Sequence, residues 1–136
     1  MTHPSDSTRE PLDAALSAAT LALAAADGAP AAEALPLLRE AQQHVTAAID
    51  EAMAAVLVTE GGSIRQAGAL AGLSENAVGP RLARTRLLAA YGSDSGRVTA
   101  AGVERARYDL EEGRHRDGSD LPDPPPPARF RARRPT

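Results

Sequence analysis

The side chains with the clearest binding chemistry are five arginines within one segment of the chain, residues 61–107. A guanidinium is planar and permanently charged, so it can donate two parallel hydrogen bonds to one phosphate. This segment holds seven arginines and three acidic residues, a net charge of +4, whereas residues 1–60 hold nine acidic residues and two arginines, a net charge of −7. A phosphate responds to charges within about 8–10 Å, so the local sign matters more than the whole-chain charge. We expect phosphate contacts from Arg65, Arg81, Arg84, Arg86 and Arg97.

These arginines also have less specific explanations. All 15 basic residues of the chain are arginine and none is lysine, which is typical of a GC-rich coding sequence, so an exposed arginine can stand where lysine would serve. Arg81 has a second interpretation, in which its stem packs inside the fold and its guanidinium binds a helix terminus. The whole-chain net charge of −3 argues weakly against a nucleic-acid binder.

A second group of residues is suited to reading base edges. An Asn side chain can pair with adenine through two hydrogen bonds, and a Glu carboxylate can accept one from the amino group of cytosine. The residues that we expect within reach of bases or the adjacent phosphate are Ser74, Glu75, Asn76 and Gly79. Glu75 has an alternative role, because an acidic side chain is favoured at the positive end of a helix.

The sequence offers no pattern for catalysis. It has no Cys, and its three His residues lie far apart without a carboxylate at metal-ligand spacing. There is no Gly-rich phosphate loop before a Lys and no nucleophile elbow. We therefore expect a protein that is not an enzyme, with no catalytic residues, no metal, no cofactor and no identifiable small-molecule ligand.

The spacing of small, apolar and polar residues between Ser63 and Leu88 predicts a helix-turn-helix. This arrangement needs a small residue where the helices cross and a residue with positive φ in the turn, and Gly68 and Gly72 occupy those positions. Ser63 is placed to cap a short helix over residues 64–70, and Ser74 is placed to cap a longer one over residues 75–89. Leu73, Val78 and Leu82 are expected to face inward.

The same segment resembles the helix-turn-helix of small bacterial DNA-binding proteins, in particular an actinobacterial type that reads S-W-x-x-I-G-x-A-L-G-V-S-x-x-A-V-x-x-R. The residues that match in register are Gly68, Leu70, Gly72, Ser74, Ala77, Val78 and Arg81. The resemblance covers about 25 residues and implies that the second helix enters the major groove of DNA with its N-terminal end nearest the bases. Pro80 departs from the pattern, since it falls inside the expected recognition helix, where it should kink the helix or become its first regular residue.

Two longer helices are predicted before this motif. The first opens at Pro11 and stops at Asp27, and the second runs from about Leu35 to Thr59, because Pro36 is unfavourable deeper inside a helix. The second helix has an apolar stripe and places Asp50 and Glu51 on its polar side; the stripe consists of Leu38, Val45, Ile49, Ala52, Met53 and Val56. It serves either as the central core helix or as a dimerisation helix, and the two roles are compatible.

After the motif, Arg97 to Thr99 fits either a short strand or a plain loop. The run from Gly96 to Gly102 resembles the wing-to-helix junction of winged helix-turn-helix regulators, which leaves a short β wing open. Thr99 is placed to cap a further helix over residues 100–112.

The expected fold class is therefore all-α: a helical hairpin, a helix-turn-helix with or without a wing, a C-terminal helix and disordered tails. The expected parts are a disordered N-terminus over 1–10, a two-helix dimerisation part over 11–60, a DNA-binding part over 61–113 and a disordered tail over 114–136. In the tail, the Arg-rich run over 129–134 either lies along phosphates or is a solvated end.

With neither a secretory signal nor an apolar run long enough to span a bilayer, we expect a cytoplasmic, nucleoid-associated protein that does not bind membranes.

Taken together, these features predict a sequence-specific protein that binds double-stranded DNA, a transcriptional regulator acting as a homodimer. The alternative is a helical protein-interaction module, such as a partition or recombination accessory protein, in which the helix-turn-helix is structural.

Overall fold

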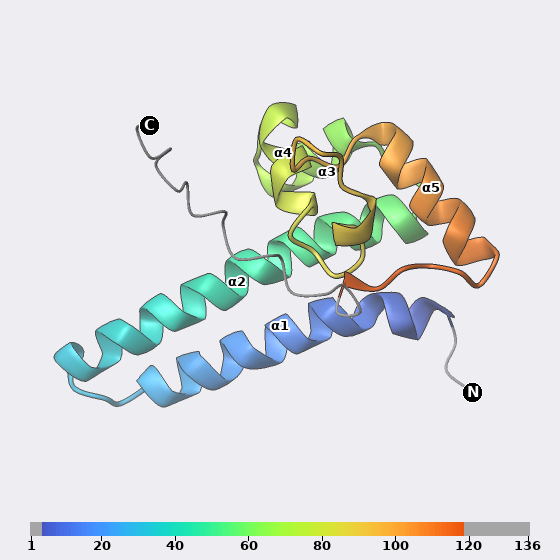
Figure 1. Ribbon diagram of the computed structural model, residues 1–136. Coiled ribbons are helices and arrows are strands. Elements are labelled where there is room, and N and C mark those ends of the chain that lie inside the picture. Colours follow the sequence, from blue (N-terminus) through green and yellow to red (C-terminus); the bar gives the residue numbers. More distant parts are fainter. Residues whose placement is uncertain (1–3, 119–136) are drawn as a thin grey trace, which may run out of the picture.

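The computed structural model describes residues 4–118, and within them every regular element is helical (Figure 1). This confirms the all-α class. The elements are α1 (Pro4–Ala26), α2 (Ala31–Thr59), α3 (Ile64–Ala71), α4 (Glu75–Leu82), the 3₁₀ turn η1 (Ala89–Tyr91) and α5 (Ala100–Glu111). The Arg-rich run over 129–134 lies outside the described residues.

The long helices α1 and α2 form an antiparallel hairpin, and the shorter helices pack against the C-terminal half of α2 (Figure 1). Alanines such as Ala19 and Ala22 of α1 and Ala41 and Ala48 of α2 are buried. Small side chains let two helices approach closely, so the hairpin is held by close packing of short side chains. The compact body formed by α3, α4, η1 and α5 is called the C-terminal module below.

The first helix begins earlier than the sequence pattern suggested. It starts at Pro4 and continues through Pro11, so the expectation that residues 1–10 are disordered is wrong for residues 4–10. Thr8 is only 4% exposed and Pro11 is buried as well. Burial of these side chains stabilises the additional turns, and a proline removes only one helical hydrogen bond.

The second helix also begins earlier, at Ala31 and not near Leu35. The carbonyl of Pro30 accepts hydrogen bonds from the backbone N–H groups of Glu33 and Ala34. Pro36 is the sixth residue of the helix, just beyond the first turn, so its missing N–H deprives only one carbonyl of a helical partner.

The exposed and buried sides of α2 differ from the predicted ones. Asp50 and Glu51, expected on the polar side, are only 9% and 8% exposed, whereas Leu38, Val45 and Ile49 of the apolar stripe are 46%, 42% and 38% exposed. The physical reason is that α1 packs on the alanine side of α2 and the C-terminal module packs near its end. The central-core role therefore applies only to the last turns of the stripe, around Met53.

The core joins the end of α2 to the C-terminal module. Leu57, Val78, Leu82 and Leu88 have no exposed surface, and they pack with residues of α5 in one cluster. Arg107 of α5 reinforces this junction: its Nε donates to the carbonyl of Leu57 at 2.7 Å, and its second guanidinium nitrogen donates to Gly62 at 2.8 Å. The first bond satisfies a carbonyl in the last turn of α2 that has no helical partner, and the second holds the loop that follows α2.

The segment after α5 packs back on the module. The hydroxyl of Tyr91 donates to Asp109 at 2.9 Å and accepts from the backbone N–H of Arg116 at 2.9 Å. The N–H of Gly118 donates to the carbonyl of Arg86 at 2.7 Å. The expected disorder from residue 114 onward is therefore wrong for residues 114–118.

Candidate nucleic-acid interface

Helices α3 and α4 are joined by a tight turn whose geometry follows from two glycines. Gly72 ends α3 with a φ of +72°, a conformation that favours glycine, and the N–H of Leu73 donates to the carbonyl of Gly68 at 2.8 Å. A Cβ atom at Gly68 would lie 2.9 Å from Cγ2 of Val78, so the two helices meet where a side chain would not fit. The predictions for the turn and for the inward positions of Val78 and Leu82 are confirmed.

The caps of α3 and α4 differ. The hydroxyl of Ser63 accepts a hydrogen bond from the N–H of Gln66 at 3.1 Å, as predicted. Ser74 occupies the N-cap position of α4 with an extended backbone, but its side chain makes no capping hydrogen bond. Its hydroxyl is therefore available to a ligand, because the residue is exposed.

The second helix of the pair is shorter than predicted. It ends at Leu82 and not near Ala89, and the chain continues through turns to η1. Thr85 stabilises this ending, since its buried hydroxyl donates to the carbonyl of Leu82 at 2.6 Å and accepts from the N–H of Leu88 at 3.2 Å. Such side-chain bonds to the backbone compete with helix continuation.

Arg97 compensates for the proline inside α4. Pro80 has no N–H, so the carbonyl of Asn76, four residues earlier, loses its helical donor. A guanidinium nitrogen of Arg97 donates to that carbonyl at 3.0 Å. Arg97 remains exposed, and its guanidinium has further N–H groups for a phosphate.

The loop that carries Arg97 covers one side of α4. The N–H of Val98 donates to the carbonyl of Gly79 at 3.0 Å, and the N–H of Ser93 donates to the carbonyl of Arg97 at 2.7 Å. The strand considered over residues 97–99 does not form within the described chain, because these bonds close a loop.

The predicted base-proximal residues fall into two groups. Ser74, Glu75 and Asn76 are exposed on the first turn of α4, so the structure brings them together at one helix end. Gly79 is buried, and a Cβ atom there would lie 3.2 Å from Nε of Arg97. The side of α4 at Gly79 is therefore covered by protein.

Two of the five predicted phosphate-binding arginines are held by acidic residues. Nε of Arg81 lies 2.6 Å from the carboxylate of Asp50, and both side chains are largely buried. This matches the packing part of the alternative interpretation of Arg81, but its partner is the carboxylate of Asp50 and not a helix terminus. Arg86 pairs with Asp117 at 3.1 Å. Each of the two arginines therefore has a carboxylate partner within the protein, and the Arg86–Asp117 pair is the more exposed of the two.

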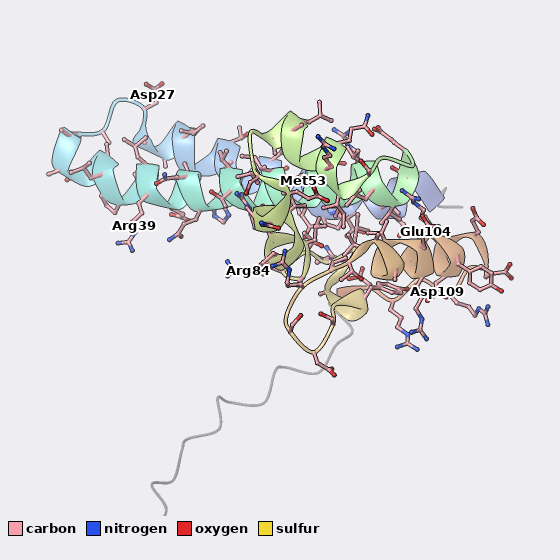
Figure 2. The ribbon with its side chains drawn as sticks, turned by 90° about the horizontal axis from the view of Figure 1, so that it is seen from above. Asp27, Arg39, Met53, Arg84, Glu104 and Asp109 are labelled. Carbon is pink, nitrogen blue, oxygen red and sulfur yellow. The ribbon has the colours of Figure 1, made fainter. Side chains whose placement is uncertain are left out.

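The remaining arginines, Arg65 and Arg84, are exposed and form no ion pair with any residue among 4–118. Figure 2 shows Arg84 on the C-terminal module, well away from the hairpin turn marked by Asp27. With Arg97, three of the five predicted phosphate-binding arginines are exposed: one in α3, one just after α4 and one in the loop before α5.

The buried acids of α2 contact the region of α4, which the sequence did not predict. Oε1 of Glu51 accepts from the backbone N–H of Arg86 at 2.7 Å, while its second oxygen is buried without a hydrogen-bond partner among the described residues. Burial raises the pKa of the Glu51 carboxyl above its ordinary value. Asp50 and Glu51 thus fix the orientation of α4 and of the turns that follow. The adjacent acids on an otherwise apolar part of α2 were the available signal.

Comparison with protein-family models, curated proteins and solved structures finds no match to this chain. Within residues 4–118, none of the helices combines the length and apolarity needed to cross a bilayer. The same residues contain no group of three or more His, Asp or Glu side chains that could hold a metal ion.

Proposed function

We propose that this protein is a sequence-specific DNA-binding protein, a transcriptional regulator that acts as a dimer and uses α3 and α4 as a helix-turn-helix. One observation carries the proposal: the exposed first turn of α4 presents Ser74, Glu75 and Asn76, and the exposed Arg97 is bonded to the carbonyl of Asn76. A helix end of this kind fits the major groove, where its first residues can reach base edges.

The contacts divide into two kinds. Asn76 and Glu75 read bases, while Arg65, Arg84 and Arg97 bind phosphates and supply most of the affinity without reading sequence. Because Arg97 is also bonded to the backbone of α4, a phosphate held by it would be fixed relative to the base-reading turn. Asp50 and Glu51 of α2 bind Arg81 and the backbone N–H of Arg86, and these contacts hold α4 at a fixed angle to α2.

Single substitutions separate these roles. Arg84→Ala should weaken binding to all duplexes alike and reduce the slope of log affinity against log salt by about one. Asn76→Ala should instead reduce discrimination at one base pair by about 1–3 kcal/mol. Fluorescence anisotropy with duplexes selected from a random pool measures both effects.

Arg9→Ala is the matched control, since it removes the same charge from α1, where Arg9 pairs with Asp13 on the surface. Equal losses for Arg9→Ala and Arg84→Ala would show that the docking face is wrong.

A second candidate function is a protein-interaction module. The observation that favours it is the pairing of Arg81 and Arg86 with acids, which lowers the positive charge expected near α4. Binding of no duplex even at low salt would support this candidate and exclude the first.

A further inference from the structure

The exposed stripe of α2 has the spacing of a coiled-coil seam. Positions 35, 38, 42, 45, 49, 52 and 56 alternate intervals of three and four, and Gln42 is the one polar member. Leu35 is 67% exposed, and Leu38, Val45 and Ile49 are also exposed. Such a seam is typical of a helix that packs against another helix, and a single polar member within it can fix the register.

Exposed leucines of α1 extend this surface to a second helix. Ala19 of α1 and Ala41 of α2 are buried and mark the line along which the two helices touch. Leu16 and Leu38 each precede one of these alanines by three residues, so each is rotated about its helix axis by about 60°, in the same sense, from that line. Antiparallel helices are related by a two-fold axis normal to their common plane, which keeps such side chains on the same side. Leu23 of α1 lies four residues after Ala19 and falls there too.

This face, called the hairpin face below, continues into a groove beside the C-terminal module. The groove has a volume of about 220 Å³ and lies between α2 and α3. Its lining is apolar and consists of Ile49, Ala52, Met53, Val56, Ala67, Leu70 and Ala71. Leu70 at its edge is 75% exposed. The volume exceeds the roughly 150 Å³ of a cavity that holds benzene, so a leucine side chain fits.

The hairpin face also lacks charge over most of its length. No charged residue occurs from Ala14 to Ala26 in α1 or from Ala41 to Ile49 in α2. The face is about 33 Å long and about 20 Å wide, from the helical rise and the usual spacing of packed helices. It therefore offers on the order of 700 Å² per chain, close to the ~800 Å² per partner of a standard interface.

From these observations we infer that the hairpin face binds the hairpin face of a second copy of this chain, with the two α2 helices antiparallel. An apolar seam without charges is complementary to itself, as a two-fold symmetric contact requires. The midpoint of the seam lies at Val45, so antiparallel pairing about that residue places Leu38 of each copy opposite Ala52 of the other, which lines the groove.

The two-fold axis of this dimer runs from α1 towards α2. The C-terminal module packs on the side of α2 away from α1 (Figure 1). Rotation about the axis does not change the position of a module along it, so both modules lie on the same side of the dimer. The module contacts α2 around residue 54, nine residues from the midpoint, so the two modules are about 27 Å apart along the helix axis. This is on the order of the 34 Å that separates successive major grooves on one face of DNA. This part rests on the proposed function and predicts two half-sites about one helical turn apart.

Sedimentation equilibrium of the full chain tests the dimer without DNA. The protein should be dimeric at tens of micromolar, and Leu38→Glu or Leu23→Glu should weaken the dimer at least tenfold, because each places a charge in an apolar contact. The matched control is Leu21→Glu. Leu21 is 72% exposed but precedes Ala22 by one residue, which turns it to the opposite side of the hairpin. A monomeric wild type, or equal effects of Leu21→Glu and Leu38→Glu, would overturn the inference.

A crosslink tests the pairing itself and does not depend on folding of a charged variant. The chain has no Cys, so Val45→Cys places a single thiol near the two-fold axis. A short bis-maleimide should link this variant into dimers and leave Leu21→Cys unlinked. Crosslinking of both variants, or of neither, would contradict the antiparallel arrangement.

The interface and the DNA-binding function can fail separately. A dimer that crosslinks at residue 45 but binds no duplex would refute the proposed function and leave the interface standing. A monomer that binds a single half-site would refute the interface and leave DNA binding standing.

Discussion

At the scale of single residues, the module depends on side chains that replace missing backbone partners. Arg97 supplies a donor where Pro80 has none, and Arg107 supplies donors to the carbonyls of Leu57 in the last turn of α2 and of Gly62 just after it. The sequence identified Arg97 as a cation but could not show its partner, because the partner is a carbonyl 21 residues away in the chain.

The role of Arg97 predicts a dependence on Pro80. Arg97→Ala should lower the free energy of unfolding by about 1 kcal/mol, since it leaves the carbonyl of Asn76 without a protein donor. In a Pro80→Ala background the same substitution should cost less, because the alanine introduced there has a backbone N–H to donate. Urea unfolding of the four proteins in this cycle gives the coupling. Additive costs would show that Arg97 does not replace the missing donor.

The buried carboxyl of Glu51 predicts a pH effect on stability. Its pKa is raised by burial above the ordinary value of 4.5, so its contribution to folding is fully present below that pH and is lost as the pH rises through the raised pKa. Glu51→Gln stays neutral and keeps an oxygen that can accept from Arg86. The variant should therefore gain stability relative to the wild type as the pH is raised from about 4 to about 8. A difference in unfolding free energy that is constant over this range would contradict the raised pKa.

At the scale of elements, local signals predicted some features and long-range packing decided others. The turn at Gly72 and the caps by Ser63 and Thr99 were predictable, because each depends on a few neighbouring residues. The early start of α1 and the early end of α4 were not, because the sequence does not show that Thr8 and Thr85 are buried.

The side of α2 that packs against α1 was likewise not predictable from the local hydrophobic pattern. Leu38, Val45 and Ile49 formed the predicted stripe, but the helix packs on α1 through Ala41 and Ala48. A stripe of alanines carries little hydrophobic signal in a sequence, although small side chains allow the closest helix contact. The arginines around α4 were predictable as a set, but the pairing of two of them with Asp50 and Asp117 depends on tertiary contacts.

The contact between α3 and α4 predicts the effect of one methyl group. Gly68→Ala should destabilise the protein by about 1–3 kcal/mol, because the new Cβ would lie 2.9 Å from Val78 and 3.1 Å from the carbonyl of Leu73. Thermal unfolding measures the loss. In a Val78→Ala background, part of the penalty should disappear, since the side chain that clashes is gone. An unchanged penalty in that background would place the strain elsewhere.

At the scale of the whole molecule, the chain separates an acidic helical hairpin from a module with exposed arginines. The hairpin leaves an apolar face open, and the module presents the first turn of α4 on the opposite side of α2 from α1. In the proposed dimer these two features belong together, because pairing of the hairpins sets the distance between two DNA-reading turns.

The most direct measurement is the salt dependence of binding to duplex DNA by fluorescence anisotropy, with protein concentrations at which the dimer is formed. Three exposed arginines on each copy predict a slope of log affinity against log salt of about −5. Anisotropy that does not change with protein at low salt, or an affinity that is independent of salt, would contradict the account.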